Sequence, residues 1–374
     1  MSSIEIIIIV FFVLGGLYTL WIGAFNIGWV LIKKTNCEPV NYVQISIIIP
    51  FRNEEAHLRD IINSLVSQNY PDTYYEIIMV DDHSGDRSMD IIQTMNQDKK
   101  MMVLKLDGAE TGKKDAIKVG IQHATGVLIA TLDADCQPGT NWLQSIANAY
   151  TLQKTRMLSG PVAINNPKGF IENFQALELL SLVGTAAGAI GIGHPIMCNG
   201  ANLIYEKSAF EEVGGFKGNE YIPGGDDIFL LEKFKQAFGR KQIGFIKNRD
   251  AIVVTQGISS LKGFIEQRIR WVAKSPSYRD AALILTAILV LLFNLSLLFS
   301  LVLAFFIPEL WYIFISLLAL KSIVDSPILF QMTSFTQQRK LMIWYLPFQL
   351  IYFMFISFSG IMGNVISYRW KGRK

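Results

Sequence analysis

Two aspartates one residue apart, Asp133 and Asp135, are the first residues whose types and spacing could do chemistry. They follow the apolar run 127–132, so both carboxylates would project beyond the end of a buried strand. Two carboxylates this close repel each other unless a cation lies between them. A hard divalent ion with oxygen ligands, Mg²⁺ or Mn²⁺, would fit and would also bind a diphosphate. A pair of this kind also occurs in surface turns, so it needs support from other residues.

Two other polar segments could contact a ligand. Asp81 and Asp82 end a second predicted strand, 76–80, where they could contact a ligand or cap a helix. Gly112 and Lys113 precede a predicted helix, an arrangement that suits a phosphate. The same pair would be unremarkable in an ordinary basic turn.

Asp226 and Asp227 follow two glycines and precede an apolar, helix-like run at 228–231. A carboxylate held there could act as a general base that takes a proton from an attacking hydroxyl. The alternative is an ordinary helix cap. Residue types alone leave both interpretations open.

The segment 257–278 mixes apolar and basic residues in a way that predicts an amphipathic helix. Its apolar side chains are Phe264, Ile265, Ile269, Trp271 and Val272, and its basic ones are Lys262, Arg268, Arg270 and Lys274. Such a helix is expected to lie at a membrane surface with its apolar side down and its arginines extended toward water.

The elements that must position these residues alternate between strand and helix patterns. The predicted strands are 43–50, 76–80, 102–106 and 127–132, and the predicted helices are 54–68, 88–96 and 114–123. This alternation predicts an α/β domain with a mostly parallel sheet over residues 44–256. Ligands of such sheets bind beyond the carboxyl ends of the strands, where Asp81, Asp82 and Asp133 fall.

Long apolar runs flank this domain. Residues 4–32 and 281–320 each contain one charged residue, and residues 341–367 contain none. About 20 helical residues cross a hydrocarbon core of roughly 30 Å. We therefore predict an N-terminal transmembrane anchor in residues 1–35 and two or three C-terminal transmembrane helices in residues 281–368.

The charges beside these runs predict an orientation. Lys33 and Lys34 predict that the α/β domain lies in the cytoplasm and that the protein is integral to the cell membrane. Three later spans would leave the basic segment 369–374 outside, against the same tendency. The weakest span, 308–330, contains Lys321 and Asp325, so it is either re-entrant or a span whose ionisable residues face the helix bundle.

Charge and cysteine usage exclude some classes of protein. The net charge is +3, but the positive excess lies beside the apolar runs and residues 36–280 are slightly acidic. A mildly acidic domain argues against a nucleic-acid partner. The three cysteines, Cys37, Cys136 and Cys198, lack metal-ligand spacing and fit a reducing compartment.

Taken in order, the segments from Ser46 to Trp271 resemble the family 2 glycosyltransferases, which have the GT-A fold. The matching stretches are SIIIPFRNE (46–54), VDDHSGD (80–86), GKKDAIKVGIQHATGVLIATLDAD (112–135), CNGANLIYEKSAFEEVGGF (198–216), GGDDIFLLEKF (224–234) and QRIRW (267–271). The last is similar to the Q-x-x-R-W element of the membrane-bound branch that includes cellulose, hyaluronan and poly-N-acetylglucosamine synthases and ceramide glucosyltransferase. The resemblance also favours three C-terminal spans.

The resemblance implies roles for individual residues. The nucleotide-sugar would be bound by Pro50, Phe51, Arg52, Glu54, Asp81, Asp82, Lys113 and Asp133. Asp135, together with Asp133, would bind the Mg²⁺ or Mn²⁺. Gln267, Arg270 and Trp271 would face the donor diphosphate and the acceptor.

The same resemblance makes Asp227 the catalytic base. The usual glutamate before the base is replaced here by Asp226, so either aspartate could fill that role. The implied reaction is an inverting transfer of a sugar from a nucleotide-sugar, with UDP favoured, to a polysaccharide or lipid acceptor.

Two rival functions remain. One is a polyprenyl-phosphate sugar transferase, although that branch usually lacks the Q-x-x-R-W element. The other is a catalytically dead membrane protein that binds sugar nucleotides, although such a protein need not retain Asp133, Asp135 and Asp227. The acceptor stays open: a polysaccharide needs a conduit, whereas a lipid needs only an interfacial groove.

Overall fold

The computed structural model describes residues 3–35, 42–96, 101–220 and 222–363. Cys37 and the basic segment 369–374, which entered the sequence analysis, lie outside these ranges. The chain divides into two compact units. The sheet unit comprises residues 32–165 and 193–256, and the helical unit comprises residues 1–31, 166–192 and 257–374. Residues 166–192, inside the predicted 44–256 domain, thus group with the long apolar helices.

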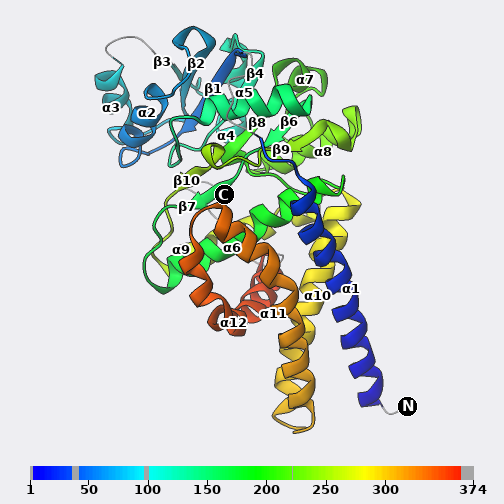
Figure 1. Cartoon of the computed structure of the whole chain (residues 1–374). Helices are drawn as coiled ribbons and strands as arrows, with labels where there is room; N and C mark the ends of the chain where they lie inside the picture. The colour runs from blue at the N-terminus through cyan, green and yellow to red at the C-terminus, as the bar shows by residue number, and fades with distance from the viewer. Residues whose placement is uncertain (1–2, 36–41, 97–100, 221, 364–374) are drawn as a thin grey trace. The chain divides into compact units, whose positions relative to one another are not determined.

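The sheet unit is built on a seven-stranded sheet in the order β3-β2-β1-β4-β8-β6-β9 (Figure 1). Its strands are β1 (Ile45–Phe51), β2 (Tyr75–Asp81), β3 (Met101–Lys105), β4 (Leu128–Thr131), β6 (Met157–Ser159), β8 (Leu203–Glu206) and β9 (Ile243–Phe245). Only β8 runs antiparallel to its neighbours, β4 and β6. The predicted α/β domain with a mostly parallel sheet is therefore confirmed.

The central strand β1 explains why the site forms at one edge of this sheet. All seven of its residues are buried, as expected for an apolar parallel strand covered on both faces. Phe51 lies opposite Asp81 of β2, and β4 flanks β1 on its other side. β1 and β2 therefore end opposite each other, β4 ends at Thr131 opposite Ile48, and the polar loops that follow these parallel strands lie at the same edge of the sheet.

The helices of the sheet unit follow the predicted alternation. They are α2 (Leu58–Val66), α3 (Ser88–Met95), α4 (Lys113–His123), α5 (Trp142–Gln153), α7 (Lys207–Glu212) and α8 (Asp226–Phe238). A small second sheet joins β5 (Gln137–Pro138), β10 (Val253–Thr255) and β7 (Val162–Ile164). The helix expected from residue 54 begins only at Leu58, because the preceding residues form a loop that is hydrogen-bonded to the loop after β2.

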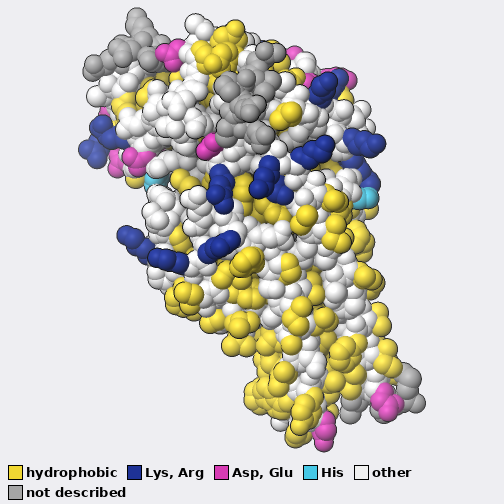
Figure 2. Space-filling view, in the orientation of Figure 1, with side chains coloured by type: hydrophobic (Ala, Val, Ile, Leu, Met, Phe, Trp, Pro, Cys, Tyr) yellow, Lys and Arg dark blue, Asp and Glu magenta, His cyan; other side chains and the backbone are white. Residues whose placement is uncertain are grey.

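The helical unit contains α1 (Ser3–Leu31), α6 (Gly169–Gly191), α9 (Leu261–Val272), α10 (Ala281–Ala304), α11 (Leu310–Phe335) and α12 (Tyr345–Met362). Among the described residues, five helical segments are long and apolar enough to cross a membrane: 5–31, 169–191, 281–304, 310–335 and 339–362. Large apolar side chains cover the outside of the long helices (Figure 2). Leu20 of α1 and Ile323 of α11, for example, are 75% and 69% exposed. This apolar exterior indicates association with a membrane.

The sequence analysis did not single out α6 as a long apolar helix. It differs from the other four because 72% of its apolar window is buried, against 17–39% in the others. Glycines let it approach α1 closely, since a Cβ at Gly188 would lie 2.2 Å from the Phe25 carbonyl oxygen. A Cβ at Gly28 would lie 1.9 Å from the Gly188 carbonyl oxygen. Small residues at such crossings are typical of helices packed within membranes.

The weakest predicted span is a continuous helix, α11, that passes through Pro327. Lys321 is fully buried and forms an ion pair with Asp325. The Tyr18 hydroxyl of α1 donates a 2.6 Å hydrogen bond to the same carboxylate. Lys321 and Asp325 therefore face neighbouring helices, whereas Glu309, just before α11, is exposed.

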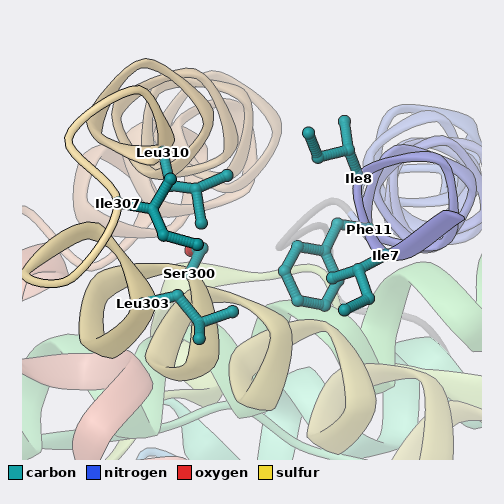
Figure 3. A pocket seen from close by; sticks show the side chains of 7 residues that line it. All are labelled: Ile7, Ile8, Phe11, Ser300, Leu303, Ile307 and Leu310. Atoms are coloured by element: carbon teal, nitrogen blue, oxygen red, sulfur yellow. The ribbon is translucent and has the colours of Figure 1, made fainter. Parts of the chain in front are cut away.

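A cavity of about 80 Å³ lies between α1 and the α10–α11 connection (Figure 3). Its lining is apolar except for one hydroxyl, and consists of Ile7, Ile8, Phe11, Ser300, Leu303, Ile307 and Leu310. The Ser300 hydroxyl donates its hydrogen bond to the Leu297 carbonyl oxygen of its own helix. This cavity lacks groups that could perform a reaction, so the chemistry must be sought in the sheet unit.

Candidate active site

Lys113 links two of the acidic segments that the sequence separates widely. Its Nζ lies 2.7 Å from Asp133 Oδ1 and 3.1 Å from Asp226 Oδ2. Lys113 is the first residue of α4, Asp133 follows β4, and Asp226 is the first residue of α8. Burial would lower the pKa of Lys113, but the surrounding carboxylates raise it well above its ordinary value. The ammonium group is therefore charged and holds the two aspartates together.

Glycines shape the turns that present these side chains. Gly112, before α4, has φ +96°, and Gly224 and Gly225, before α8, have φ +72° and +67°. Side-chain-bearing residues rarely adopt these values, so glycine permits the abrupt entry into each helix. Asp226 and Asp227 are thereby placed in the first turn of α8, where the helix dipole stabilises negative charge.

Asp227 differs from Asp226 in its surroundings. Asp226 is 8% exposed and contacts Lys113, whereas Asp227 is partly exposed. The Gly200 backbone N–H donates a 3.2 Å hydrogen bond to Asp227 Oδ2. The carboxylate of Asp227 is thus oriented by the backbone while it remains accessible.

Gly200 is a site residue that sequence reasoning missed. It begins a short 3₁₀ helix, Gly200–Asn202, and its carbonyl oxygen accepts a hydrogen bond from the Thr131 hydroxyl. A Cβ at this position would lie 3.0 Å from Asp226 Oδ2 and 3.2 Å from Lys113 Nζ. The matching stretch CNGAN contained the residue, but a glycine carries no chemical group to attract attention.

Asp135 lies in a second, more acidic part of the site. The Thr255 hydroxyl donates a 3.3 Å hydrogen bond to Asp135 Oδ2. Burial and then the nearby charges of Asp133 and Glu54 raise the pKa of the Asp135 carboxyl. A cation beside Asp135 would offset these nearby negative charges.

The residues present fit a divalent ion that is only partly ligated by protein. Within the described ranges, His, Cys, Asp and Glu side chains do not form a group of three or more that could hold a metal ion. Mg²⁺-type sites commonly use one or two carboxylates and complete the shell with water and substrate phosphates. Asp133 also has a basic partner that is distant in sequence, because Lys113 reaches it from α4.

The residues assigned to nucleotide binding gather after β1 and β2. The Asp82 N–H donates to the Phe51 carbonyl oxygen, which joins the two strand ends. Burial raises the pKa of Asp82, although the Gly112 backbone and the Arg52 charge oppose this rise. The neighbouring Asp81 is fully buried, and its Oδ1 accepts a hydrogen bond from the Ser84 N–H. Asp81 therefore shapes the loop.

Two loops at these strand ends are tied together by side chains that sequence reasoning did not assign. The Asn53 N–H donates to the Ser84 hydroxyl, and the Gly85 N–H donates to Asn53 Oδ1 at 2.8 Å. The Glu54 N–H donates to the Ser88 hydroxyl at 2.9 Å. Asn53 has a φ of +52°, a conformation that asparagine tolerates better than most residues. The Asn and Ser residues in both loops were the sequence signal that could have predicted these hydrogen bonds.

The residues Gln267, Arg270 and Trp271 belong to α9 of the helical unit. All three are partly exposed. The expectation that Arg268 lies on the solvent side of this helix was wrong, because Arg268 is 6% exposed and pairs with Glu178 of α6. The apolar residues Phe264 and Ile269 are also buried within the helical unit.

Comparisons with known proteins agree with this architecture. Residues 46–214 match the family described as "Glycosyl transferase family 2". Glycosyltransferase AglE of Haloferax volcanii is 26% identical over 184 residues, which are 49% of this chain and 58% of that protein. The beta-monoglucosyldiacylglycerol synthase of Trichormus variabilis is 30% identical over 198 residues, 50% of this chain and 41% of that protein. The chain thus spans about half the length of the curated relatives it matches.

A solved structure has the same fold over almost the whole chain. The mannosyltransferase PcManGT from Pyrobaculum calidifontis, in complex with GDP-Man and Mn²⁺, superposes with a TM-score of 0.60 at 16% identity. The superposition covers 96% of this chain and 98% of that one. Residues 46–214 are therefore similar to the glycosyltransferase family 2 domain, and the chain has a GT-A-like α/β fold.

Proposed function

We propose that this protein is a membrane-embedded, inverting glycosyltransferase that moves a sugar from a nucleotide-sugar to a hydroxyl of a membrane-borne acceptor. The observation that carries the proposal is the contact of Lys113 with Asp133 and Asp226, next to Asp227, where Lys113 and Asp133 belong to the family-matched residues 46–214. In a displacement at the anomeric carbon, a carboxylate can take the proton of the attacking hydroxyl, and an ammonium can stabilise the charge of the leaving diphosphate.

Asp227 is the proposed general base. It takes the proton of the acceptor hydroxyl as that oxygen attacks the anomeric carbon from the face opposite the leaving diphosphate. Two observations favour Asp227 over Asp226: its partial exposure and the Gly200 N–H that orients one of its oxygens. Asp226, buried against the Lys113 ammonium, is poorly suited to accept a proton.

Lys113 is proposed to stabilise charge on the leaving group. Its ammonium lies between the strand end that carries Asp133 and the helix that carries the base. From this position the ammonium can offset the negative charge of the leaving diphosphate and hold the donor near the proposed base. A Mg²⁺ or Mn²⁺ ion bound by Asp135 and Asp133 would add Lewis-acid stabilisation of the same diphosphate.

The nucleotide is proposed to bind at the ends of β1 and β2, against Pro50, Phe51, Arg52, Glu54, Asp81 and Asp82. The tied loops there form a rigid platform. A UDP-sugar is the donor we propose first. The solved neighbour's GDP-Man makes a GDP-sugar the competing donor.

The acceptor is proposed to come from the membrane, with Gln267, Arg270 and Trp271 contacting the acceptor and donor diphosphate. The long apolar helices support membrane embedding, and Lys33 and Lys34 after α1 support a cytoplasmic sheet unit. Relatives described as a glucosyldiacylglycerol synthase and as a poly-N-acetylglucosamine synthase keep both a lipid and a glycan acceptor open.

The test is incubation of membranes that contain the protein with radiolabelled UDP- and GDP-sugars. Product is sorted into lipid-extractable and polymeric fractions, and membranes that contain the Asp227→Asn variant serve as the control. Label in either fraction that depends on Asp227 supports the proposal. Parent protein that binds a nucleotide-sugar but never transfers label would contradict it.

A further inference from the structure

An ion pair joins α9 to α6 in the interior of the helical unit. Arg268 Nη2 lies 2.5 Å from Glu178 Oε2, and the two side chains are only 7% and 4% exposed. Desolvation of two charges opposes folding, so such a pair is a poor device for stability alone. Buried charge pairs are better explained where a defined geometry is needed, and this one lies within the QRIRW segment.

The Arg268 guanidinium also lies over the aromatic ring of Trp271. The distance from Arg268 Cζ to the indole ring centre is 4.0 Å, and the distance to the Phe264 ring centre is 5.1 Å. The three residues fall on adjacent turns of α9, where side chains three or four positions apart meet. Arg268 thus connects a carboxylate on another helix to an indole that is partly exposed.

Phe264, the second ring near the guanidinium, is itself held by aromatic rings of two other helices. Phe264 stacks on Phe355 of α12, with ring centres 5.0 Å apart and planes inclined by 6°. Phe264 also meets the ring of Phe174, one turn before Glu178 on α6. A planar guanidinium held by a carboxylate and two rings has one orientation, whereas a flexible lysine ammonium would not impose a plane on Trp271.

We propose that Glu178 and Arg268 are positioning residues that set the plane of Trp271 for the acceptor. Glu178 fixes Arg268 through the ion pair, and Arg268 fixes the indole by stacking against it. The inference rests on the proposed function of Trp271 as a face for the acceptor. It adds that the acceptor geometry is determined from α6, by a residue outside the QRIRW segment.

The main test compares Arg268→Lys, Trp271→Phe and the double variant. Arg268→Lys keeps the charge opposite Glu178 and removes the guanidinium that lies over the indole ring. We expect kcat/KM for the acceptor to fall about tenfold or more, because small misplacements of a reacting group are costly. Nucleotide-sugar binding and hydrolysis of the donor without acceptor should stay within about twofold of the parent.

The double variant separates positioning from a general structural role. If Arg268 acts through Trp271, Arg268→Lys should have little further effect on acceptor kcat/KM once Trp271 is phenylalanine. Additive losses, or a matching loss of donor hydrolysis, would overturn the inference. Lys262→Gln is the matched control. It removes a charge from the same helix at a side chain that is 88% exposed, so transfer should be unchanged.

Two further outcomes keep the inference separate from the proposed function. If Trp271→Phe transfers as well as the parent, the acceptor role of Trp271 fails and the inference fails with it, while Asp227-dependent transfer still supports the general function. If Arg268→Lys does not purify as a folded protein, Glu178→Gln takes its place, since an amide keeps the shape and removes the charge. Unchanged acceptor kinetics in a folded Glu178→Gln protein would likewise overturn the inference.

Discussion

Lys113 and Asp226 lie 3.1 Å apart and join the first turn of α4 to the first turn of α8. This contact brings the strand end with Asp133 next to the helix that carries the proposed base. We expect Lys113→Met to lower kcat about 100-fold, because the charge that faces the leaving diphosphate is lost. Steady-state transfer by the purified protein measures the effect.

The matched control for this change is Lys118→Gln, on the exposed side of the same helix. It should transfer sugar at the parent rate. Lys113→Met protein with a kcat within a few-fold of the parent would show that the ammonium only holds the fold together.

The base assignment predicts unequal effects at two adjacent aspartates. Asp227→Asn should lower kcat by about 10²–10⁴ while nucleotide binding persists, since an amide cannot accept the acceptor's proton. Asp226→Asn should retain more activity, because its main contact is with Lys113. Near-parent turnover by Asp227→Asn would move the role of base to Asp226. Isothermal titration with UDP checks that binding is intact.

Gly200 makes a steric prediction. In Gly200→Ala the new methyl group would crowd Asp226 and Lys113 at 3.0 and 3.2 Å, so one of them must shift. We expect kcat to fall about tenfold with little change in thermal stability, because misplacement of catalytic groups affects rate strongly. Gly108→Ala, where a Cβ would meet nothing within 4 Å, is the control. Equal activity of the two variants would remove Gly200 from the site.

Removal of divalent ions should abolish transfer. The charges of Asp133 and Glu54 disfavour ionisation of Asp135, so a cation should bind beside Asp135 and Asp133 once a diphosphate completes its shell. We expect EDTA to stop transfer and Mn²⁺ or Mg²⁺ to restore it. Asp135→Asn should also weaken Mn²⁺ binding in the presence of UDP, measured by electron paramagnetic resonance. Full transfer in excess chelator would show that the aspartates do not bind a metal and instead stabilise the fold, Asp133 through its ion pair with Lys113.

Local patterns were enough to predict the strand ends of the site. The buried run of β1 and the aspartates after β2 and β4 follow from apolar runs that stop at polar residues. Those patterns could not reveal that Lys113 reaches Asp226, since the two are far apart in sequence. The same limit hid the role of Gly200, which acts through its backbone N–H and its lack of a side chain.

Two errors in the helical unit also have physical causes. Arg268 was placed on the solvent side because a lone arginine is usually exposed, and its partner Glu178 lies on a different helix. Helix α6 was passed over because its apolar run contains Glu172 and Glu178 and several glycines. Its glycines allow close packing against α1. The spacing of apolar residues in the sequence does not reveal such packing.

Glu76 predicts how the stability of the sheet unit depends on pH. This carboxylate, at the start of β2, accepts hydrogen bonds from the Ser46 hydroxyl of β1 and from the N–H and hydroxyl of Thr125. Burial would raise the pKa of Glu76, but hydrogen bonds from Ser46, Thr125 and Gly126 outweigh that effect and lower it below the ordinary value. A carboxyl with a lowered pKa stabilises the fold above its unfolded pKa, and this stabilisation disappears as the pH falls through the folded pKa.

Glu76→Gln should therefore lower the free energy of unfolding by about 1–3 kcal/mol at pH 7, the usual contribution of hydrogen bonds to a charged group. The difference between parent and variant should shrink as the pH falls below about 4, because the parent carboxylate is then protonated. Urea unfolding of the purified protein at a series of pH values measures both quantities. Glu211→Gln is the control, since its side chain is 61% exposed and its Oε1 lies as far as 4.0 Å from Lys207 Nζ. A pH-independent difference for Glu76→Gln would mean that side-chain shape, rather than charge, ties β1, β2 and the turn before β4 together.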